Sequence, residues 1–219
     1  MTRTFLIVGP TAAGKSDLAA DVASEMGAEI VSADAFQIYR GLDLLTAKPD
    51  ASTLAKAPHH LIGITPLHKA MNAEKYRRAT SRAIDEIHAR GKVAIVVGGS
   101  GLYIKSLTHG LAPLPESDPK VREKLNTMSL DELRSQLVEF DPEATGKIDM
   151  KNRRRIIRAL EICLLTGKPA SAQREQWAVA EGVDLGNLGD VPPRSTPAAT
   201  GVFVYRDREE LYARINRRV

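Results

Sequence analysis

Cysteine is almost absent from this chain, and its scarcity excludes several kinds of chemistry. Cys163 is the only cysteine among 219 residues, and no other cysteine or histidine stands at metal-ligand spacing from it. An internal disulfide and a cysteine-based metal site are therefore excluded. Cys163 lies within the apolar run 159–164, so we expect it to be a small buried residue.

Long hydrophobic runs are missing as well. Hydrophobic residues make up 43% of the chain, yet no stretch approaches the 18 or so apolar residues that a membrane-spanning helix needs. The first four residues lead straight into a short apolar segment with no cleavable signal. We expect a cytoplasmic protein with no membrane partner. The sequence does not fix the oligomeric state, and a monomer is our working expectation.

The charge is nearly balanced, but the basic residues are unevenly distributed. Thirty-one Lys and Arg against 27 Asp and Glu give a net charge of +4. One basic cluster falls within residues 147–158 and a second within 206–218. Such clusters attract phosphate backbones, whereas the alternative interpretation is a solvated helix face.

A phosphate-binding motif lies close to the N-terminus. Residues 9–16 match the pattern G-x-x-x-x-G-K-[S/T] and follow the apolar run 5–8 directly. The glycines let the backbone curl with its N–H groups inward, the lysine reaches a terminal phosphate, and the hydroxyl can ligate Mg²⁺. We predict that this loop binds a di- or triphosphate group through Gly9, Pro10, Thr11, Ala12, Ala13, Gly14, Lys15 and Ser16.

Strands and helices alternate along the first half of the chain. The apolar patterns predict strands at 5–8, 29–32, 92–97 and 201–205, and helices from Lys15, at 73–90, 102–108 and 207–219. The stretch 42–58 is predicted to be a loop, because two prolines interrupt it. The fold class is therefore α/β, a P-loop NTPase-like parallel sheet flanked by helices.

The pattern changes at Asp118, after which helices occur without strands. Asp118 is expected to cap a helix at 119–127, Ser129 and Glu132 form a capping box for the next, and a long helix spans 151–166. We predict a catalytic core at 1–117, a helical insertion with a mobile connection at 118–200, and a return to the core at 201–219.

Asp34 stands where a catalytic group would be expected. Ligands of parallel sheets bind at the carboxyl ends of the strands, and Gly9, Asp34 and Ser100 all fall at such ends. Asp34 would lie near the phosphate loop. It would either contact the ligands of a bound Mg²⁺ or act as a general base. No apolar run ends in Asp-Glu, so ATP hydrolysis is a poor first hypothesis, and a pyrophosphate leaving group is a better one.

The chain resembles the bacterial tRNA dimethylallyltransferases along essentially its whole length. Six motifs occur in the order typical of that family. They are G-P-T-A-A-G-K-S, S-A-D-A-F-Q-I-Y-R-G, T-A-K-P at 46–49, V-G-G-S-G-L-Y at 97–103, R-x-x-R-A-L-E at 155–161 and D-R-E-E-L-Y-x-R-I at 207–215.

The resemblance implies an activity and its participants. Family members move a dimethylallyl group from dimethylallyl pyrophosphate to N6 of the tRNA adenosine just 3′ of the anticodon. By resemblance Asp34 accepts the proton of this weakly nucleophilic amine, and Ser100, which matches a family threonine, places a hydroxyl beside the reacting centre. Lys15, Mg²⁺ on Ser16 and Arg218 would stabilise the departing pyrophosphate.

The resemblance also implies where tRNA binds. An adenine in the anticodon stem-loop must leave its stack to meet the donor. The matching tRNA-contacting residues are Asp34, Ala35, Phe36, Gln37, Ser100, Arg122, Arg154, Arg155, Ile156, Ile157 and Arg158.

Several positions depart from the family pattern. Ala35 replaces the usual Ser, Leu45 the usual Gly, and Gly63 the usual Asp. His59 and His60 are expected to be packing or polar-cap residues rather than metal ligands, because no third ligand is spaced to join them. Family members also continue past Val219, so we expect this chain to be a fragment.

Two other hypotheses remain open at this point. A small-molecule kinase would share the phosphate loop and the sheet, with the basic helix near 151–158 as a lid over ATP. Such a kinase has no place for the motifs at 46–49 and 98–103. A non-enzymatic RNA-binding fragment is the third. The loop itself does not say whether ATP also binds there.

Overall fold

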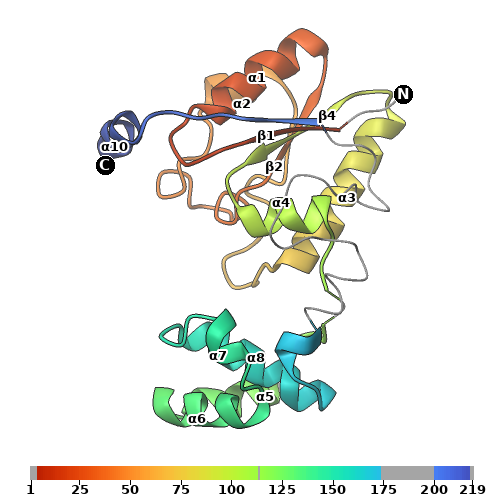
Figure 1. Ribbon diagram of the computed structural model, residues 1–219. Coiled ribbons are helices and arrows are strands. Elements are labelled where there is room, and N and C mark those ends of the chain that lie inside the picture. Colours follow the sequence, from red (N-terminus) through yellow and green to blue (C-terminus); the bar gives the residue numbers. More distant parts are fainter. Residues whose placement is uncertain (1–3, 113, 174–199, 218–219) are drawn as a thin grey trace. The chain divides into compact units, whose positions relative to one another are not determined.

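The computed structural model describes residues 4–112, 114–173 and 200–217. They fall into two compact units (Figure 1), one built from Met1–Gly110 with Pro192–Val219 and the other from Leu111–Val191. Each unit has a core of its own and is described separately. Within the described residues, none of the helices combines the length and the apolar character that crossing a membrane would take.

The first unit is built on a parallel sheet of five strands. Along the sheet the order is β3-β2-β4-β1-β5, and each neighbouring pair is parallel. The carboxyl ends of all the strands therefore meet at one edge. The strands are β1 Thr4–Val8, β2 Glu29–Ser32, β3 His59–His60, β4 Ala94–Gly98 and β5 Thr200–Phe203.

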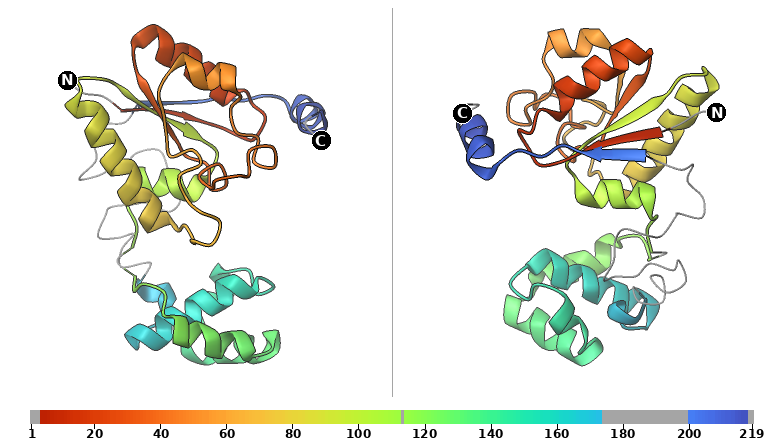
Figure 2. Two further views of the ribbon diagram at one scale, coloured as in Figure 1. Left: turned by 180° about the vertical axis from the view of Figure 1, so that it is seen from behind. Right: turned by 45° about the horizontal axis from the view of Figure 1, so that its top comes forward.

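Helices cover both faces of this sheet. Figures 1 and 2 show α1 and α2 on one face and α3 and α4 on the other. The last helix, α10, follows β5 beyond the edge of the sheet. The helices are α1 Lys15–Met26, α2 Ala51–Lys56, α3 Ala73–Ala89, α4 Gly101–Thr108 and α10 Arg208–Asn216.

The central strands are buried on both faces because alternate side chains point to opposite layers. Ile30 and Ile95 belong to the cluster that includes the alanines of α1, whereas Val31 and Val96 belong to the cluster under α3 and α4. A two-residue repeat produces this alternation in a strand. It explains why β2 and β4 are short, continuous apolar runs.

The predicted fold class is confirmed, but two elements of the segment 42–58 and its border were missed. Asp50 accepts the N–H of Thr53 at 2.7 Å and so caps α2. The two-residue β3 pairs with Ile30 and Val31. Neither element is long enough to produce a readable hydrophobic period, so the prolines dominated the prediction.

The second unit consists of helices packed around their own core. They are α5 Pro119–Thr127, α6 Leu130–Phe140, α7 Ala144–Lys147 and α8 Arg153–Thr166. Asp118 caps α5 and the Ser129–Glu132 capping box begins α6, as the sequence predicts. The helix α8 begins at Arg153 rather than at residue 151, because the side chain of Asn152 caps it.

The units divide earlier in the chain than the sequence suggested. We expected boundaries at 117/118 and 200/201, whereas the first division between the compact units lies at 110/111. The predicted mobile connection falls largely on residues 174–199, outside the described residues. The segment before α5 belongs to the helical unit for a physical reason. Ser117 donates to the buried carboxylate of Glu161 at 2.8 Å, and Leu114 packs on the helical core.

Candidate active site

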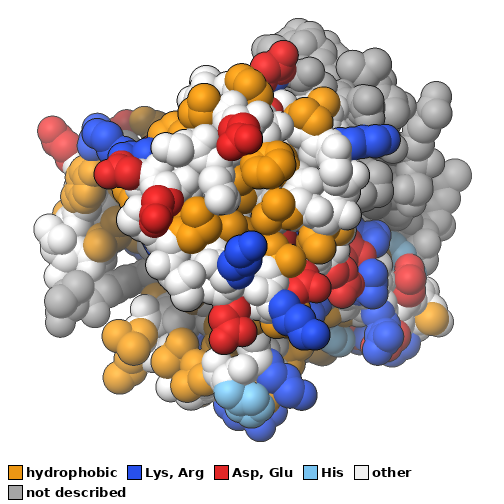
Figure 3. All heavy atoms as spheres, turned by 90° about the horizontal axis from the view of Figure 1, so that it is seen from below, with side chains coloured by type: hydrophobic (Ala, Val, Ile, Leu, Met, Phe, Trp, Pro, Cys, Tyr) orange, Lys and Arg blue, Asp and Glu red, His pale blue; other side chains and the backbone are white. Residues whose placement is uncertain are grey.

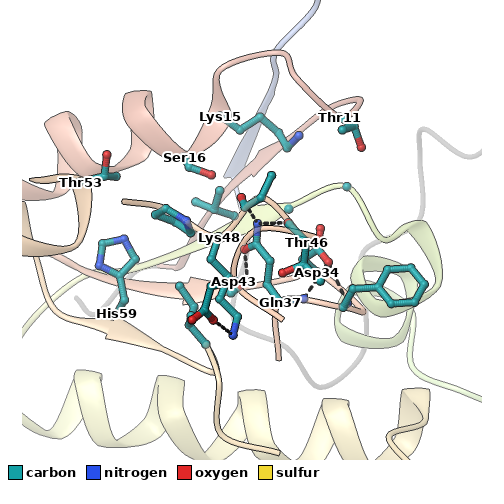
Figure 4. Close-up of a pocket in the computed structure, with 18 of the residues that line it drawn as sticks. Thr11, Lys15, Ser16, Asp34, Gln37, Asp43, Thr46, Lys48, Thr53 and His59 are labelled. Atoms are coloured by element: carbon teal, nitrogen blue, oxygen red, sulfur yellow. Dashed lines mark hydrogen bonds and ion pairs between the residues drawn. The ribbon is translucent and has the colours of Figure 1, made fainter. Parts of the chain in front are cut away.

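One cavity lies at the carboxyl edge of the sheet in the first unit. It encloses about 920 Å³, within the range of small-molecule sites. Figure 4 shows side chains from the phosphate loop, from the segment after β2 and from the loop 42–50 around the same space. Lining residues that the sequence predicted for the site are Thr11, Ala12, Gly14, Lys15, Ser16, Asp34, Phe36, Gln37 and Ser100.

The phosphate loop has the backbone that anion binding requires. Gly14 has φ 89° and directly precedes α1, which places the helix N-terminus beside the cavity. A side chain at Gly9 would come within 2.3 Å of the carbonyl oxygen of Val204, so only glycine fits there. Lys15 Nζ donates to the carbonyl oxygen of Pro10 at 2.7 Å, which places its ammonium group at the loop.

Gly9, Pro10 and Ala13 are loop residues that do not line the cavity. Ala13 is buried, and its carbonyl oxygen accepts a hydrogen bond from Arg206. These residues shape the loop, and their contact with phosphate stays a prediction. Arg218, the other predicted phosphate ligand, lies outside the described residues.

Asp34 is fixed by the turn that follows β2. Its Oδ1 accepts the backbone N–H groups of Phe36 at 2.8 Å and Gln37 at 3.1 Å. Both bonds use the same oxygen, and the structure gives Oδ2 no partner within the described residues. The carboxylate thus keeps one oxygen for a group that enters the cavity.

Ser100 is bound to the same turn through two hydrogen bonds. Its backbone N–H donates to the carbonyl oxygen of Ala33 at 3.2 Å, and its Oγ accepts the N–H of Ala35 at 2.9 Å. Because Oγ acts as acceptor here, its own proton remains available for donation. A Cβ at Gly98 would lie 2.1 Å from the oxygen of Ala33, so the ends of β2 and β4 meet closely.

Gln37 joins the loop 42–48 to this edge of the sheet. Its Nε2 donates to the carbonyl oxygens of Thr46 at 3.3 Å and Ala47 at 3.0 Å. Lys48, only 7% exposed, donates to Tyr39 O and pairs with Asp43. These contacts give the motif at 46–49 a structural role that the sequence did not reveal.

Hydrophobic side chains border the polar groups of the cavity. Leu44 is 96% exposed, Leu45 is 88% exposed and Phe36 is 66% exposed, and all three line the cavity. Exposed apolar side chains grouped at a pocket commonly mark a binding surface. Leu45 therefore adds apolar surface at the border of the cavity.

The two histidines of β3 have protein partners. His59 Nδ1 lies 2.7 Å from the carbonyl oxygen of Ala57, and His60 Nε2 lies 2.7 Å from Glu29. Burial lowers the pKa of His59, which favours the neutral ring. Within the described part of the chain, no group of three His, Cys, Asp or Glu could hold a metal ion.

The predicted RNA-binding residues of the helical unit separate into three kinds. Arg154 and Arg155 are exposed at the start of α8. Arg122 and Arg158 instead bind Glu161, which is fully buried, at distances of 3.1 and 2.6 Å. Burial raises the pKa of Glu161, but hydrogen bonds from Arg158, Ser117 and Arg122 outweigh it, so the net shift is downward.

Ile156 and Ile157 are the third kind, and their predicted contact with tRNA stays a prediction. Their side chains are 0% and 7% exposed and pack in the helical core. An amphipathic helix must turn part of its surface inward, and the family segment that contains them cannot present every residue to RNA. Figure 3 shows one face of the molecule. Acidic, basic and hydrophobic side chains are mixed on this face, and charges of one sign do not form a separate region there.

Sequence reasoning missed two arginines at the phosphate loop. Arg206 Nε donates to Ala13 O at 2.9 Å, and Arg214 Nε donates to Ala12 O at 2.8 Å. The basic cluster at 206–218 was the available signal. It did not show which of its members would face the loop.

The comparisons with known proteins agree with this geometry. The family model described as IPP transferase matches residues 37–219. The chain belongs to the IPP transferase family. It is 42% identical to the tRNA dimethylallyltransferase of Geobacter sulfurreducens over 223 residues, which cover 100% of this chain and 67% of that relative.

Solved structures show the same fold. A full-length tRNA isopentenylpyrophosphate transferase from Bacillus halodurans is 32% identical with a TM-score of 0.58, covering 100% of this chain and 65% of that one. A eukaryotic dimethylallyltransferase acting on tRNA is 24% identical with a TM-score of 0.76, covering 99% of this chain and 52% of that one. This family member thus spans about two thirds of the bacterial relatives' length.

Proposed function

We propose that this IPP transferase family member moves a dimethylallyl group from dimethylallyl pyrophosphate to N6 of the tRNA adenosine 3′ of the anticodon, releasing pyrophosphate. One observation carries the proposal. The phosphate loop, Asp34 and Ser100 line a single cavity that also has apolar side chains at its border. This combination suits a donor with a charged and an apolar end.

The pyrophosphate of the donor would lie on the phosphate loop. The N-terminus of α1, the loop amides and Lys15 all favour negative charge there. The Ser16 hydroxyl fits Mg²⁺, since this ion prefers oxygen ligands and takes few of them from protein when phosphates and waters supply the others. Bound Mg²⁺ would neutralise part of the charge that pyrophosphate carries.

Asp34 is proposed as the general base. N6 forms its bond to the donor carbon that carries the pyrophosphate, and the bond from that carbon to the pyrophosphate oxygen breaks. The N6 proton then passes to Oδ2 of Asp34, because Oδ1 already accepts two backbone N–H groups. The Ser100 hydroxyl, fixed against Ala35, would orient the amine.

The acceptor would be tRNA, whose adenine must be extruded into the cavity. Exposed Phe36 offers a surface on which a base can stack. Arg154 and Arg155 offer contacts to the phosphate backbone. The kinase hypothesis is not favoured, because relatives that are 42% and 43% identical over 100% and 99% of this chain are named as tRNA dimethylallyltransferases.

Transfer of radiolabelled dimethylallyl to total tRNA, measured beside ATP turnover, tests the proposal. We expect label in tRNA, and a loss of about a hundredfold or more in Asp34→Asn with both substrates still bound, because a positioned base contributes roughly 10² to 10⁴. Asp85→Asn, an exposed substitution on α3, is the matched control. Wild-type turnover by Asp34→Asn would contradict the assignment.

A second arm separates the two substrates. Lys15→Ala should weaken dimethylallyl pyrophosphate and its unreactive analogues while leaving tRNA affinity nearly unchanged, because the loop contacts the donor only. Filter binding measures the tRNA affinity. An equal loss of both affinities would mean that the loop binds RNA instead.

A further inference from the structure

The segment after β5 runs along the phosphate loop. Val204 N donates to Val8 O at 2.8 Å, which extends the pairing of β5 with β1 up to the first glycine of the loop. Arg206 and Arg214 then contact the loop, although they are about 200 positions away from their partners in the sequence.

Each arginine binds the phosphate loop through its Nε atom and places its Nη2 atom beside Gly14. Each donates Nε to a loop carbonyl oxygen. The Nη2 atoms of Arg206 and Arg214 lie 3.6 and 3.8 Å from the point where a Cβ of Gly14 would stand. Two guanidinium groups therefore converge on Gly14, which itself lines the cavity and precedes α1.

This convergence is electrostatically unfavourable without an anion. Two cations meet at a helix N-terminus, which carries partial positive charge of its own. Glu210 pairs with Nη1 of Arg206, but the described residues provide no ion pair for Arg214. Both arginines are half-buried, so water screens their repulsion less than at an open surface.

We propose that Arg206 and Arg214 are pyrophosphate-binding residues, which hold the loop through Nε and donate Nη2 to the pyrophosphate oxygens. Arginine suits this double role, because its planar fork presents several donors in fixed geometry. The identity of the anion rests on the proposed function, whereas the convergence of the two arginines does not.

Calorimetric titration of inorganic pyrophosphate with Mg²⁺ into the whole chain tests the inference. Arg206→Gln and Arg214→Gln should each weaken binding about tenfold or more, as expected for a lost charge-assisted hydrogen bond. The corresponding Lys variants should retain part of the affinity because they keep the charge. Arg208→Gln is the control, since Arg208 contacts Tyr212 on α10 rather than the loop.

A role confined to bracing the loop predicts another pattern. Gln variants, whose Nε2 stands at the position of arginine Nε, would then keep more affinity than Lys variants, which have no donor at that position. This result would overturn the inference, as would wild-type affinity in both Gln variants. Titrating tRNA separates pyrophosphate from backbone phosphate, and tRNA affinity should not change. If pyrophosphate binding depends on both arginines but no dimethylallyl is transferred, the inference stands and the proposed function fails.

Discussion

Two carboxylates lie five residues apart on and after β2, and their surroundings give them different roles. Glu29 is 5% exposed and accepts bonds from Arg90, His60 and Lys92. Asp34 faces the cavity, and its hydrogen-bond partners among the described residues are the backbone N–H groups of Phe36 and Gln37. Glu29 at the start of β2 is therefore engaged in ion pairs within the fold, whereas Asp34 after the strand has one oxygen available for its proposed role as general base.

Glu29 should make stability depend on pH in acid. Hydrogen bonding from Arg90, opposed by burial and assisted by His60 and Lys92, lowers the pKa of Glu29 from 4.5 to about 2. The folded-state pKa is depressed, so the stabilisation is fully present above about pH 4.5 and is lost as the pH falls through about 2. A shift of this size corresponds to roughly 3 kcal/mol.

Urea unfolding of Glu29→Gln at several pH values measures this contribution. We expect the variant to be less stable than the wild type near neutral pH, with the difference shrinking from about pH 4.5 downward. Glu25→Gln, an exposed change on α1, should show no such convergence. A difference that stays constant down to about pH 2 would show that the loss has a cause other than the ionised carboxylate.

Some site residues could be predicted from the sequence and others could not. Asp34 and Ser100 could be predicted because each follows an apolar strand, and parallel strands place such residues at one edge of the sheet. Arg206 and Arg214 were not, because their contacts depend on β5 pairing with β1 across the sheet. The hydrogen bonds from Gln37 to the carbonyl oxygens of Thr46 and Ala47 were also missed, because a backbone carbonyl in a loop has no sequence signature.

At the scale of the element, α8 combines structural and exposed arginines within one turn. Arg153 donates to the carbonyl oxygens of Asn126 and Met128 at the end of α5, at 3.0 and 2.6 Å. The side chains of Arg154 and Arg155 are exposed and have no hydrogen-bond or ion-pair partner within the described residues. A basic cluster read as one RNA-binding unit in the sequence is thus divided by the helical period.

Replacing Arg154 and Arg155 together by Ala should weaken tRNA binding and lower its salt dependence by about one to two units of slope, because each lost phosphate contact removes roughly 0.7 to 0.9. Pyrophosphate affinity should not change. Arg153→Ala is the matched comparison and should lower stability while keeping the slope. Titrations of tRNA at several salt concentrations decide the matter, and an unchanged slope in the double variant would assign these arginines to a solvated helix face.

At the scale of the whole molecule, the chain contains separate cores. Leu137 is fully buried among helices α5 to α8, and Ile95 is 1% exposed in the sheet. The sequence predicted this organisation through the change from alternating elements to helices alone. It misplaced the first boundary, because the contact of Ser117 with Glu161 joins residues 44 positions apart and leaves no local pattern.

Separate cores should unfold separately. Leu137→Ala and Ile95→Ala each create a cavity, and large-to-small core changes of this kind cost about 2–5 kcal/mol for Leu and Ile. We expect each variant to destabilise its own unit and to leave the other nearly unchanged, because each side chain packs only within its own cluster. Hydrogen exchange resolved by peptide in increasing urea measures both units in one experiment. Equal loss of protection across both units in either variant would show that the two cores fold as one cooperative structure, and it would contradict the division of the chain at residue 110.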